Sequence, residues 1–569
     1  RAGRIEPIRP MRRRAFLSLP PLGALTACAP RVRELAGGFT GIDVQHGHAL
    51  RDALAQGQLP AATEHRRTRV LIAGGGVAGL SAARALRLAG MQDFALLELE
   101  AEAGGNSRAT QVAGIACPRG AHYLPLPGDD ASEVQGFLEE LGLRRRVAGR
   151  WQYDERSLCH SPQERLYWQG AWHEGLLPVD GVGAGTLAQY QRFAQRVAAL
   201  SRQARFAMPT LRTWQQNNGL APAHQALDAL VFDNWLAREG FDDAHLRWYL
   251  DYCCRDDYGA GSSRVSAWAG IHYFASRHGF EAPGEGAGDE RDAVLTWPEG
   301  NGWLTRQLAA PLATKDQLHT ATSVLRITEQ RHGVEVDALE HASGRVTRWQ
   351  AERCVVALPL FIAARVLQNP PAFVRAAAAR LAWAPWLVAN IHIARPLQDR
   401  PGAAPAWDNV LYDHEARGGL GYVDAGHQRL NLDAQIAGPT VLSYYQALGD
   451  WPDGRTQLLT QPWTHWRDAI LRTLARPHPD ILERATRMEI TRYGHAMAIP
   501  RPGDQTVMSQ IGLQRLSGKR CQLLNGERTA LPPTPATGRL AFAHADWSGY
   551  SVFEEAFTRG MGAGMLASL

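Results

Sequence analysis

Apolar residues occur along this chain in two patterns: short uninterrupted runs, and longer segments with helical spacing. The runs 69–73, 94–97 and 354–358 are rich in Val, Leu, Ile and Ala, and each is short enough to be a buried parallel strand. Residues 80–88 lie between the first two runs, and their apolar positions suit a helix. The order strand, helix, strand predicts a βαβ unit and therefore an α/β fold.

Two other stretches have different patterns. Residues 388–393, Val-Ala-Asn-Ile-His-Ile, alternate in the way expected of a sheet strand. Residues 151–295 instead show helical periodicity and many aromatic residues, as in 232–236 and 246–250. We therefore predict a region of helices and sheet in addition to the βαβ unit.

A glycine-rich turn joins the first predicted strand to its helix. It reads Gly74-Gly75-Gly76-Val77-Ala78-Gly79, which fits the pattern G-x-G-x-x-G. The first glycine of the pattern permits a tight turn, the second lets the backbone approach a pyrophosphate, and the third lets the helix pack closely. The N–H groups that open the helix favour phosphate. Glu98 ends the next strand, where it can accept hydrogen bonds from ribose hydroxyls, so the segment predicts a dinucleotide site.

The residues after Glu98 indicate which dinucleotide is bound. They read Leu99-Glu100-Ala101-Glu102-Ala103-Gly104-Gly105-Asn106-Ser107-Arg108. This segment resembles the flavin-containing amine oxidase superfamily, which includes monoamine oxidases, protoporphyrinogen oxidase and the carotenoid desaturases. The resemblance implies FAD, with Gly104 and Gly105 beside its phosphates. Asn106 replaces the family's arginine, and Arg108 is the candidate substitute.

Further segments resemble the family in the same order along residues 66–569. Gly120-Ala121-His122-Tyr123 resembles the segment that passes close to the flavin ring. Residues 297–302, Trp-Pro-Glu-Gly-Asn-Gly, resemble a turn before a helix. Residues 324–327 resemble the strand whose backbone meets the adenine, which makes Val324 a cofactor contact.

The C-terminal segment completes the predicted cofactor site. Asp546 follows an apolar strand and matches an acid that, in the family, hydrogen-bonds the ribityl chain. Ser551-Val552-Phe553-Glu554 fits a capping box, so we expect it to begin the last helix. The N-terminus of that helix would face the flavin pyrimidine and favour its anionic reduced form.

The resemblance implies an α/β fold, with a Rossmann-like FAD-binding domain of the glutathione-reductase type and an interleaved α+β substrate domain. The predicted boundaries are 1–28 for an export signal, 29–65 for a linker, 66–150, 296–380 and 516–569 for the FAD-binding parts, 151–295 for a helical cap, and 381–515 for the substrate-domain sheet.

The implied activity is transfer of a hydride from a small molecule, such as an amine, to flavin N5. Many members of the superfamily place a lysine near N5, but the matching stretch 386–390, Trp-Leu-Val-Ala-Asn, contains none. The two lysines of the chain, Lys315 and Lys519, lie elsewhere. This departure argues against an oxygen-using amine oxidase and favours a dehydrogenase or desaturase of the same fold that reduces a quinone or another acceptor, although oxygen stays open as the acceptor. A flavin-binding protein without turnover is the third alternative.

Four residues are candidates for the substrate pocket: His495, His122, Tyr493 and Trp386. The first could act as a base or a hydrogen-bond donor because histidine titrates near neutrality, and structural roles are the alternative for all four. Asp256-Asp257-Tyr258 could hold a cationic substrate, although the sequence favours a solvated loop there.

The charge of the chain argues against a nucleic-acid partner. The net charge is +5, but residues 1–28 hold six arginines and one acid, so the remainder is electrically balanced. The seven cysteines show no C-x-x-C spacing, and the chain has no H-E-x-x-H motif, so no metal site is predicted. Cys253 and Cys254 are predicted to be a buried helical pair, and disulfide pairing stays open.

Residues 1–28 resemble a bacterial export address. Met11, the expected start, precedes Arg12-Arg13-Arg14-Ala15-Phe16-Leu17, which resembles the twin-arginine signal, and Leu25-Thr26-Ala27-Cys28 resembles a lipobox. The apolar stretch between them is too short to span a bilayer. We therefore expect a periplasmic protein that the export machinery carries in folded form and a lipid on Cys28 tethers to the membrane. A basic tail with a chance cysteine is the alternative.

Overall fold

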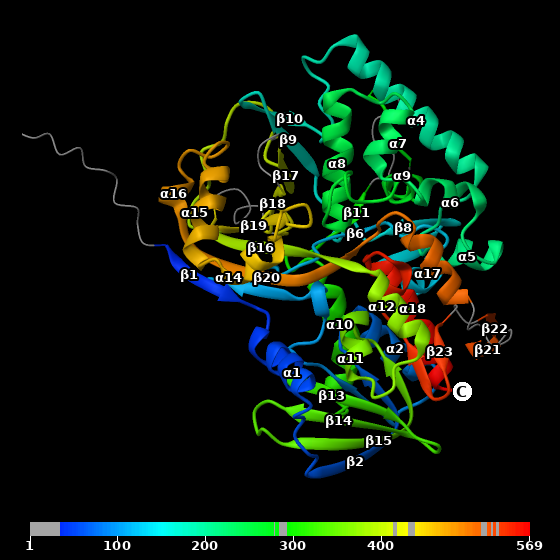
Figure 1. Cartoon of the computed structure of the whole chain (residues 1–569). Helices are drawn as coiled ribbons and strands as arrows, with labels where there is room; N and C mark the ends of the chain where they lie inside the picture. The colour runs from blue at the N-terminus through cyan, green and yellow to red at the C-terminus, as the bar shows by residue number, and fades with distance from the viewer. Residues whose placement is uncertain are drawn as a thin grey trace, which may run out of the picture.

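The computed structural model describes residues 35–277, 279–283, 293–412, 418–430, 438–513, 521–524, 527–530 and 534–569. The export signal and lipobox predicted from the sequence lie outside these residues. Two large sheets and a layer of helices make up the described part of the molecule (Figure 1).

The first sheet contains the predicted βαβ unit, and we call it, with its helices, the dinucleotide domain. Its strands follow the order β12-β3-β2-β15-β14-β13, with β24 beside β15 and β23 beside β24. Strands β3, β2, β15 and β24 pair in parallel, whereas β13, β14 and β15 form an antiparallel layer. The strands are β2 (Glu64–Ala73), β3 (Phe94–Leu97), β12 (Leu318–His319), β13 (Thr322–Glu329), β14 (Val334–Glu340), β15 (Val346–Val356), β23 (Ala536–Thr537) and β24 (Leu540–Phe542).

Helices α2 (Val77–Leu88), α10 (Gly302–Ala313) and α18 (Phe553–Ala567) pack together in this domain. Small residues let the first and last of them approach closely. A Cβ at Gly560 would lie 2.1 Å from the carbonyl oxygen of Ala78, and one at Gly564 would lie 2.3 Å from that of Ala82. The C-terminal helix is thereby fixed against the helix that follows the glycine-rich turn.

The second sheet follows the order β1-β20-β16-β19-β18-β17-β9-β10. Its long central strands β16 and β20 pair antiparallel and extend over the dinucleotide domain in Figure 1. Its strands are β1 (Ala36–Thr40), β9 (Glu164–Trp168), β10 (Ala171–Glu174), β16 (Ala382–Ile393), β17 (Asp408–Leu411), β18 (Gly419–Asp424), β19 (Thr440–Ala447) and β20 (Ala485–Ile499). The hairpin β9–β10 thus belongs to this sheet, although the sequence placed it in the helical cap.

The helical layer packs against one part of this sheet through an aromatic-rich core (Figure 1). Cys253 and Cys254 are buried in α8, as the sequence predicted, and neither forms a disulfide, a point that the sequence left open. The helices of the layer are α4 (Ala184–Gln203), α6 (Pro222–Asp228), α7 (Phe232–Arg238), α8 (Ala244–Tyr258) and α9 (Ala267–Ala275), while α14 (Gly454–Thr460), α15 (Trp463–Leu474) and α16 (Ile481–Arg484) accompany the sheet elsewhere.

Short elements connect these layers. They are η1 (Gly105–Ser107), β4 (Ala109–Val112), β5 (Ile115–Pro118), β6 (Leu124–Pro125), α3 (Ser132–Glu140), β7 (Arg144–Val147), β8 (Arg150–Tyr153), α5 (Leu211–Asn217), β11 (Val294–Leu295), α11 (Leu360–Val366), α12 (Ala372–Arg380), α17 (Asp504–Leu513), β21 (Cys521–Leu524), β22 (Glu527–Ala530) and η3 (Ala545–Ser548).

Residues 36–56 correct the prediction of a plain linker over 29–65. They form β1 and helix α1 (Val44–Gln56), and we call this segment the N-terminal strap. Strand β1 pairs in parallel with β20 of the second sheet, while α1 contacts β13 of the dinucleotide domain. The strap therefore bridges both sheets.

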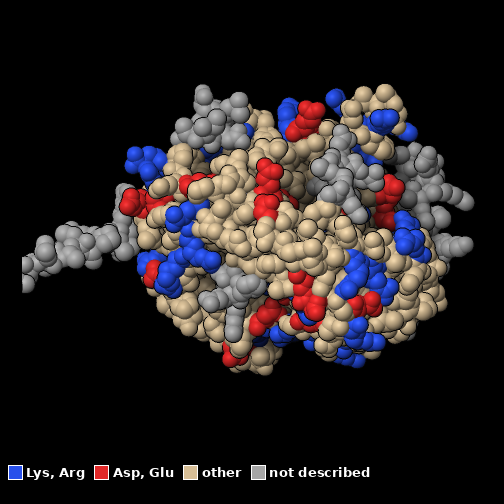
Figure 2. All heavy atoms as spheres, turned by 90° about the horizontal axis from the view of Figure 1, so that it is seen from above, with Lys and Arg blue, Asp and Glu red and all other residues tan. Residues whose placement is uncertain are grey.

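The surface carries charges of both signs in an intermixed arrangement. On the face shown in Figure 2, Lys and Arg side chains alternate with Asp and Glu side chains, in keeping with the balanced composition. Among the described residues, no helix is long and apolar enough to cross a membrane.

Candidate active site

One large cavity of about 480 Å³ lies between the dinucleotide domain and the second sheet, a size typical of cofactor and substrate sites. Most residues that the sequence analysis selected line this cavity: Gly74, Gly76, Val77, Ala78, Glu98, Gly104, Gly105, Gly120, Ala121, His122, Tyr123, Val324, Trp386, Tyr493, His495, Asp546, Ser551 and Val552. The sequence therefore identified residues from distant segments that the fold brings to one place.

The glycine-rich turn contributes three glycines with different constraints. Gly74 has a φ of +102°, and a Cβ there would lie 2.4 Å from the carbonyl oxygen of Ala357. Gly79 does not line the cavity; a Cβ there would lie 1.8 Å from the carbonyl oxygen of Gly74, so this glycine serves helix packing. A Cβ at Gly76 would meet only the Cα of Gly105, at 3.8 Å. Protein packing therefore does not exclude a side chain at Gly76, and the space beside it belongs to the cavity.

Glu98 follows β3 as a buried carboxylate that faces the cavity. It accepts hydrogen bonds from the backbone N–H of Gly75 at 2.7 Å and of Glu100 at 2.8 Å. Burial raises the pKa of Glu98, although these two N–H groups oppose the rise. A carboxylate held in this way can accept further hydrogen bonds from a ribose diol.

Arg108 does not occupy the phosphate position that the sequence assigned to it. It lies outside the residues that line the cavity, and its guanidinium donates to the carbonyl oxygens of Gly105 and Gly41 and to the carboxylate of Glu100. Asn106 instead lines the cavity, and its amide nitrogen donates to the carbonyl oxygen of Ala496 on β20 at 2.5 Å. The carboxylate of Glu100 and the strap carbonyl of Gly41 therefore bind the guanidinium of Arg108 outside the cavity.

Asp546 lies at the cavity, but in the turn η3 and not at a strand end. It accepts hydrogen bonds from the backbone N–H of Leu360 at 2.9 Å and from the indole N–H of Trp383 at 3.2 Å. Burial acts to raise its pKa, but His544 and these donors leave the pKa below its ordinary value. Asp546 is therefore an ionised acceptor beside the cavity.

The predicted capping box does not form. Helix α18 begins at Phe553 after Val552, and no side chain caps it. The hydroxyl of Ser551 accepts a hydrogen bond from the backbone N–H of Ala498 on β20 at 3.1 Å. Glu554 is buried in the first turn and lines the cavity, and burial raises its pKa to about 7. The N-terminus of α18 still opens towards the cavity, as the sequence predicted.

His122 and Tyr123 stand in an aromatic wall of the cavity. The His122 ring stacks on Tyr445 with the ring centroids 4.4 Å apart. Burial lowers the pKa of His122 to about 3, so its imidazole is neutral at physiological pH. The hydroxyls of Tyr445 and Tyr493 donate to the carbonyl oxygens of Gly120 and Arg119, at 3.1 and 3.0 Å. These tyrosines therefore hold residues 119–123 in place.

Trp386 and His495 occupy other parts of the wall. Trp386 is buried on β16, with its ring centroid 6.4 Å from that of Tyr445. His495 is exposed and stacks on Phe361, with the ring centroids 4.4 Å apart. Although solvent reaches part of this side chain, the enclosure of its ring beside the cavity lowers the pKa of His495 to about 4, and the charge of Arg455 adds to the shift. Both predicted histidines are therefore neutral.

Asp256 is the feature that the sequence analysis underestimated. It lies in the last turn of α8, not in a solvated loop, and it lines the cavity together with Asp257 and Arg277. The Tyr123 hydroxyl donates to Asp256 at 3.2 Å. Burial raises the pKa of Asp256 to about 7, and the charge of Asp257 adds to the rise. The sequence did contain a signal for this site: two adjacent acids lie among aromatic residues near the end of a predicted helix.

A comparison with models of protein families places the chain. Residues 77–563 match the model for flavin containing amine oxidoreductase, which covers most of the chain. The chain belongs to this family. The family member described here is an FAD-dependent oxidoreductase that resembles amine oxidases, as the sequence predicted.

Solved structures with the same fold include two amine oxidases and an isomerase. Putrescine oxidase bound to putrescine is 16% identical, with 89% of this chain and 98% of that chain covered and a TM-score of 0.60. Cyclohexylamine oxidase from Brevibacterium oxydans IH-35A is 17% identical over 88% and 98%, with a TM-score of 0.60. A fatty acid isomerase from P. acnes that produces CLA is 14% identical over 87% and 97%, with a TM-score of 0.57. A comparison with curated proteins found no match.

The cavity fits the FAD that the family binds. Glu98 provides the buried acceptor for a ribose, Gly76 and Gly105 line the cavity without side chains, and α2 begins directly after Gly76. Gly47 and Leu50 of the N-terminal strap also line the cavity, a contribution that the sequence did not reveal.

Replacing Gly76 by valine should remove the cofactor without unfolding the protein, because its side chain would extend into the cavity and not into the protein core. We expect FAD affinity to fall by at least about tenfold, which corresponds to about 1.4 kcal/mol. Flavin absorbance of the purified protein and titration of the apoprotein with FAD measure this. Gly79→Ala is the matched control: it should lower the thermal stability of the apoprotein, which Gly76→Val should leave unchanged. Normal flavin content in Gly76→Val would contradict the assignment.

Proposed function

We propose that this protein oxidises a cationic amine and that Asp256 binds the ammonium group of the substrate. The carrying observation is an excess of acidic side chains over cations at the end of the cavity beside α8 and the start of α18. Asp256, Asp257 and Glu554 all line it, and among the described lining residues Arg277 is the one permanently charged cation.

Among the described residues, Asp256 forms no ion pair. Arg277 donates to both carboxylate oxygens of Asp257 at 3.0 Å, so it binds that acid directly. Asp256 accepts a hydrogen bond from the neutral hydroxyl of Tyr123, and the charges of Arg277 and Arg255 act on it only from a greater distance. Asp408 is a neighbouring acid. Burial raises the pKa of its carboxyl well above the ordinary value, and the charge of Asp256 adds to the rise. A buried carboxylate without a cation is costly, and an ammonium ligand would offset that cost.

The surrounding side chains suit the reaction of such a ligand. FAD, when bound, supplies the hydride acceptor. Tyr123 holds Asp256 in position, and the rings of His122, Tyr445 and Trp386 form apolar walls that exclude water. Because His122 is neutral, it does not repel an ammonium group. The chain's own contribution is therefore orientation and a dry, anionic pocket.

Anaerobic reduction of the purified flavoprotein tests the proposal. Primary amines and diamines should bleach the flavin absorbance, while alcohols and carboxylates of the same carbon skeleton should not. Reduction by the neutral compounds at rates equal to those of the amines would overturn the proposal, as would a failure of every amine to reduce the flavin.

We propose in addition that the electrons leave to a quinone or a similar acceptor more readily than to oxygen. Two observations support this alternative to a true oxidase: no lysine occurs among the described lining residues, and Lys315 lies elsewhere, bound to Gln92. A membrane tether at Cys28 would keep the enzyme near quinones.

Export in folded form and a lipid tether at Cys28 belong to the same proposal, and they rest on the sequence of residues 1–28. Full-length protein produced in a bacterial host should appear in the membrane pellet, and Cys28→Ser should move it to the soluble periplasmic fraction. Arg13→Lys together with Arg14→Lys should keep it in the cytoplasm. Identical fractionation of the wild type and Cys28→Ser would show that the lipobox is a chance match.

A further inference from the structure

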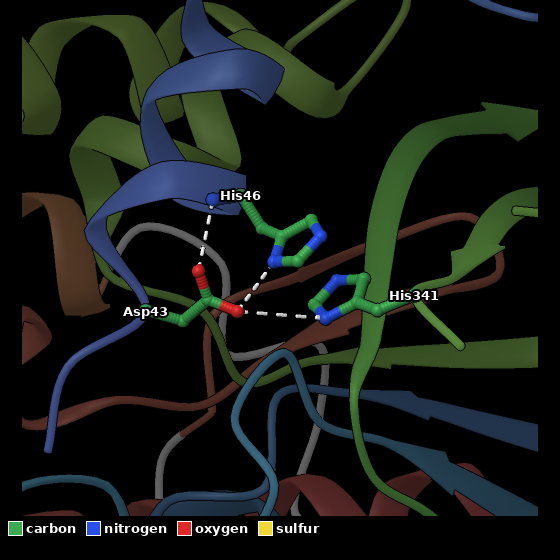
Figure 3. Close-up of side chains that lie close together, drawn as sticks. All are labelled: Asp43, His46 and His341. Atoms are coloured by element: carbon green, nitrogen blue, oxygen red, sulfur yellow. Dashed lines mark hydrogen bonds and ion pairs between the residues drawn. The ribbon is translucent and has the colours of Figure 1, made fainter.

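Three side chains from the N-terminal strap and the dinucleotide domain converge on one point (Figure 3). Asp43 and His46 come from the first turn of α1, and His341 follows β14. The Nδ1 atoms of both imidazoles face the same carboxylate oxygen of Asp43, at 2.5 Å for His46 and 3.6 Å for His341. One ligand atom from each residue lies within 4.8 Å of the other two.

We propose that Asp43, His46 and His341 bind one divalent transition-metal ion of the zinc class. Two imidazole nitrogens and a carboxylate oxygen suit zinc and its neighbours, whereas magnesium and calcium prefer oxygen ligands throughout. Three protein ligands leave a fourth position for water.

The hydrogen bonds around the cluster prepare it for coordination. Ser323 on β13 contacts Nε2 of His341 at 2.8 Å, and an Nε2–H that donates to this hydroxyl leaves the Nδ1 lone pair free. The other carboxylate oxygen of Asp43 accepts from the backbone N–H of His46 at 2.9 Å, which fixes the carboxylate. Each partner thus orients a ligand without using the atom that would face the ion.

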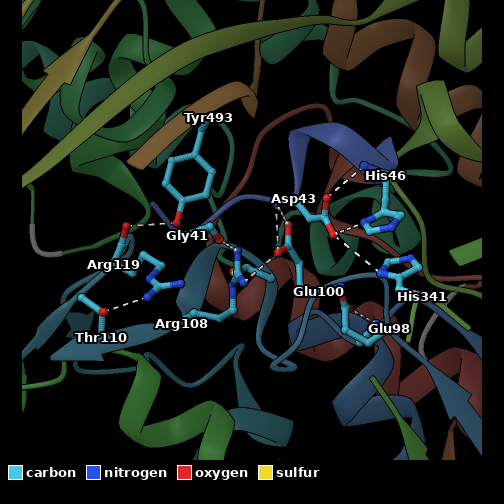
Figure 4. Close-up of polar contacts among 12 residues, drawn as sticks. Gly41, Asp43, His46, Glu98, Glu100, Arg108, Thr110, Arg119, His341 and Tyr493 are labelled. Carbon is cyan, nitrogen blue, oxygen red and sulfur yellow. Dashed lines mark hydrogen bonds and ion pairs between the residues drawn. The ribbon is translucent and has the colours of Figure 1, made fainter. Parts of the chain in front are cut away.

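The charges around the cluster favour a cation. The backbone N–H of Asp43 donates to Glu100, which adds a second carboxylate beside the cluster (Figure 4). Glu100 also pairs with Arg108, so the surroundings are close to neutral and Asp43 supplies the charge that attracts the cation.

The two rings are stacked with centroids 3.6 Å apart and planes 5° from parallel. An imidazole lone pair lies in the plane of its ring, so coordination turns the two planes towards a common ion about their Cβ–Cγ bonds. Figure 3 shows that both Nδ1 atoms already lie on the side of the carboxylate, so each ring needs only a small rotation.

The ion would join two parts of the chain that are far apart in sequence. Asp43 and His46 belong to the strap, whose residues Gly47 and Leu50 line the cofactor cavity, while His341 belongs to the dinucleotide domain. Metal binding would therefore hold the strap against the sheet and stabilise the folded chain.

Calorimetric titration of the FAD-loaded, chelator-treated protein with Zn²⁺ tests the proposal. One equivalent should bind, and His341→Ala and His46→Ala should each weaken binding by about 10²-fold or more. Ser323→Ala should weaken it by about tenfold, as expected for a residue that orients a ligand. His332→Ala, which removes an exposed histidine after β13, is the control and should change nothing. Mg²⁺ should give no saturable binding.

Asp43→Asn guards against loss of folding, because asparagine also caps helices well but is a poorer ligand. Its circular dichroism should match the wild type while zinc affinity falls. Zn²⁺ should also raise the melting temperature of the wild type and not that of His341→Ala. Absence of saturable zinc binding, binding unchanged in both histidine variants, or binding lost in His332→Ala would each overturn the proposal.

Discussion

The variant Asp256→Asn should reduce its flavin with amines about 10²-fold more slowly than the wild type, measured as the second-order rate constant at low substrate. Loss of one partner of a buried charge pair costs about 3 kcal/mol, and this cost appears in the rate when the pair anchors the substrate. Asparagine keeps the shape of the residue and can still accept the hydrogen bond from Tyr123. Anaerobic stopped-flow spectroscopy of the flavin measures the effect.

Two controls separate this effect from a general loss of structure. Asp468→Asn changes a half-exposed carboxylate on α15 and should leave the rate unchanged. The pH dependence gives the second control. Because burial raises the pKa of Asp256 to about 7, the wild-type rate should fall as the pH drops through that value and the carboxyl gains a proton. Asp256→Asn should lack this fall; the same fall in both proteins would assign it to another group.

Reduced enzyme should be reoxidised more slowly by oxygen than by a soluble quinone analogue. Transfer of electrons to oxygen develops negative charge that a nearby cation stabilises, and a missing donor of this kind costs about 2 to 4 kcal/mol, or on the order of 10²-fold in rate. The described cavity wall lacks lysine, and Arg277 is engaged by Asp257. Stopped-flow mixing of the reduced enzyme with each oxidant measures both rates.

The two histidines of the cavity wall do not supply the missing positive charge. Burial lowers the pKa of His122 to about 3 and that of His495 to about 4, so neither ring gains a proton near neutrality. Neither histidine should therefore add a pH dependence to the oxygen rate between about pH 6 and 8, where Asp256 and Glu554 are cavity groups that do titrate. An oxygen rate that equals the quinone rate would contradict the neutral site.

The cofactor half of the site was predictable because its signals are local. The turn at Gly74 and the strand that ends in Glu98 carry their constraints within about 25 residues, where backbone geometry and a phosphate contact dictate the residue types. The run 388–393 likewise predicted β16, although the strand is not buried on one face alone: every residue of the run except His392 is buried.

Features that depend on distant partners were not predictable. Ser551 looks like a helix cap, but the free N–H of Ala498 on β20 is the donor that its hydroxyl accepts from. Arg108 looks like a phosphate ligand, but Glu100 and the carbonyl oxygen of Gly41 take its guanidinium. Asp256 looks solvated, but the tertiary fold buries the end of α8 against the cavity.

The structure of the strap could not be predicted from the sequence for the same reason. Strand β1 reads Ala-Gly-Gly-Phe-Thr, which carries almost no hydrophobic pattern, and its residues are only partly buried. Its conformation is set by pairing with β20 and by contacts such as that between Arg108 and Gly41 (Figure 4). The strap therefore has a well-defined position although its own sequence carries only a weak hydrophobic pattern.

The pairing of β1 with β20 also dictates an order of assembly. Ala36 pairs with Arg487, so the first described strand waits during synthesis until nearly the whole chain has left the ribosome. Until then β1 has no partner strand, and Gly47 and Leu50 of the strap, which line the cavity, are not anchored through it. Asp546 and Glu554, which also line the cavity, are made later still. The strap and the C-terminal segment therefore complete the cavity only at the end of synthesis.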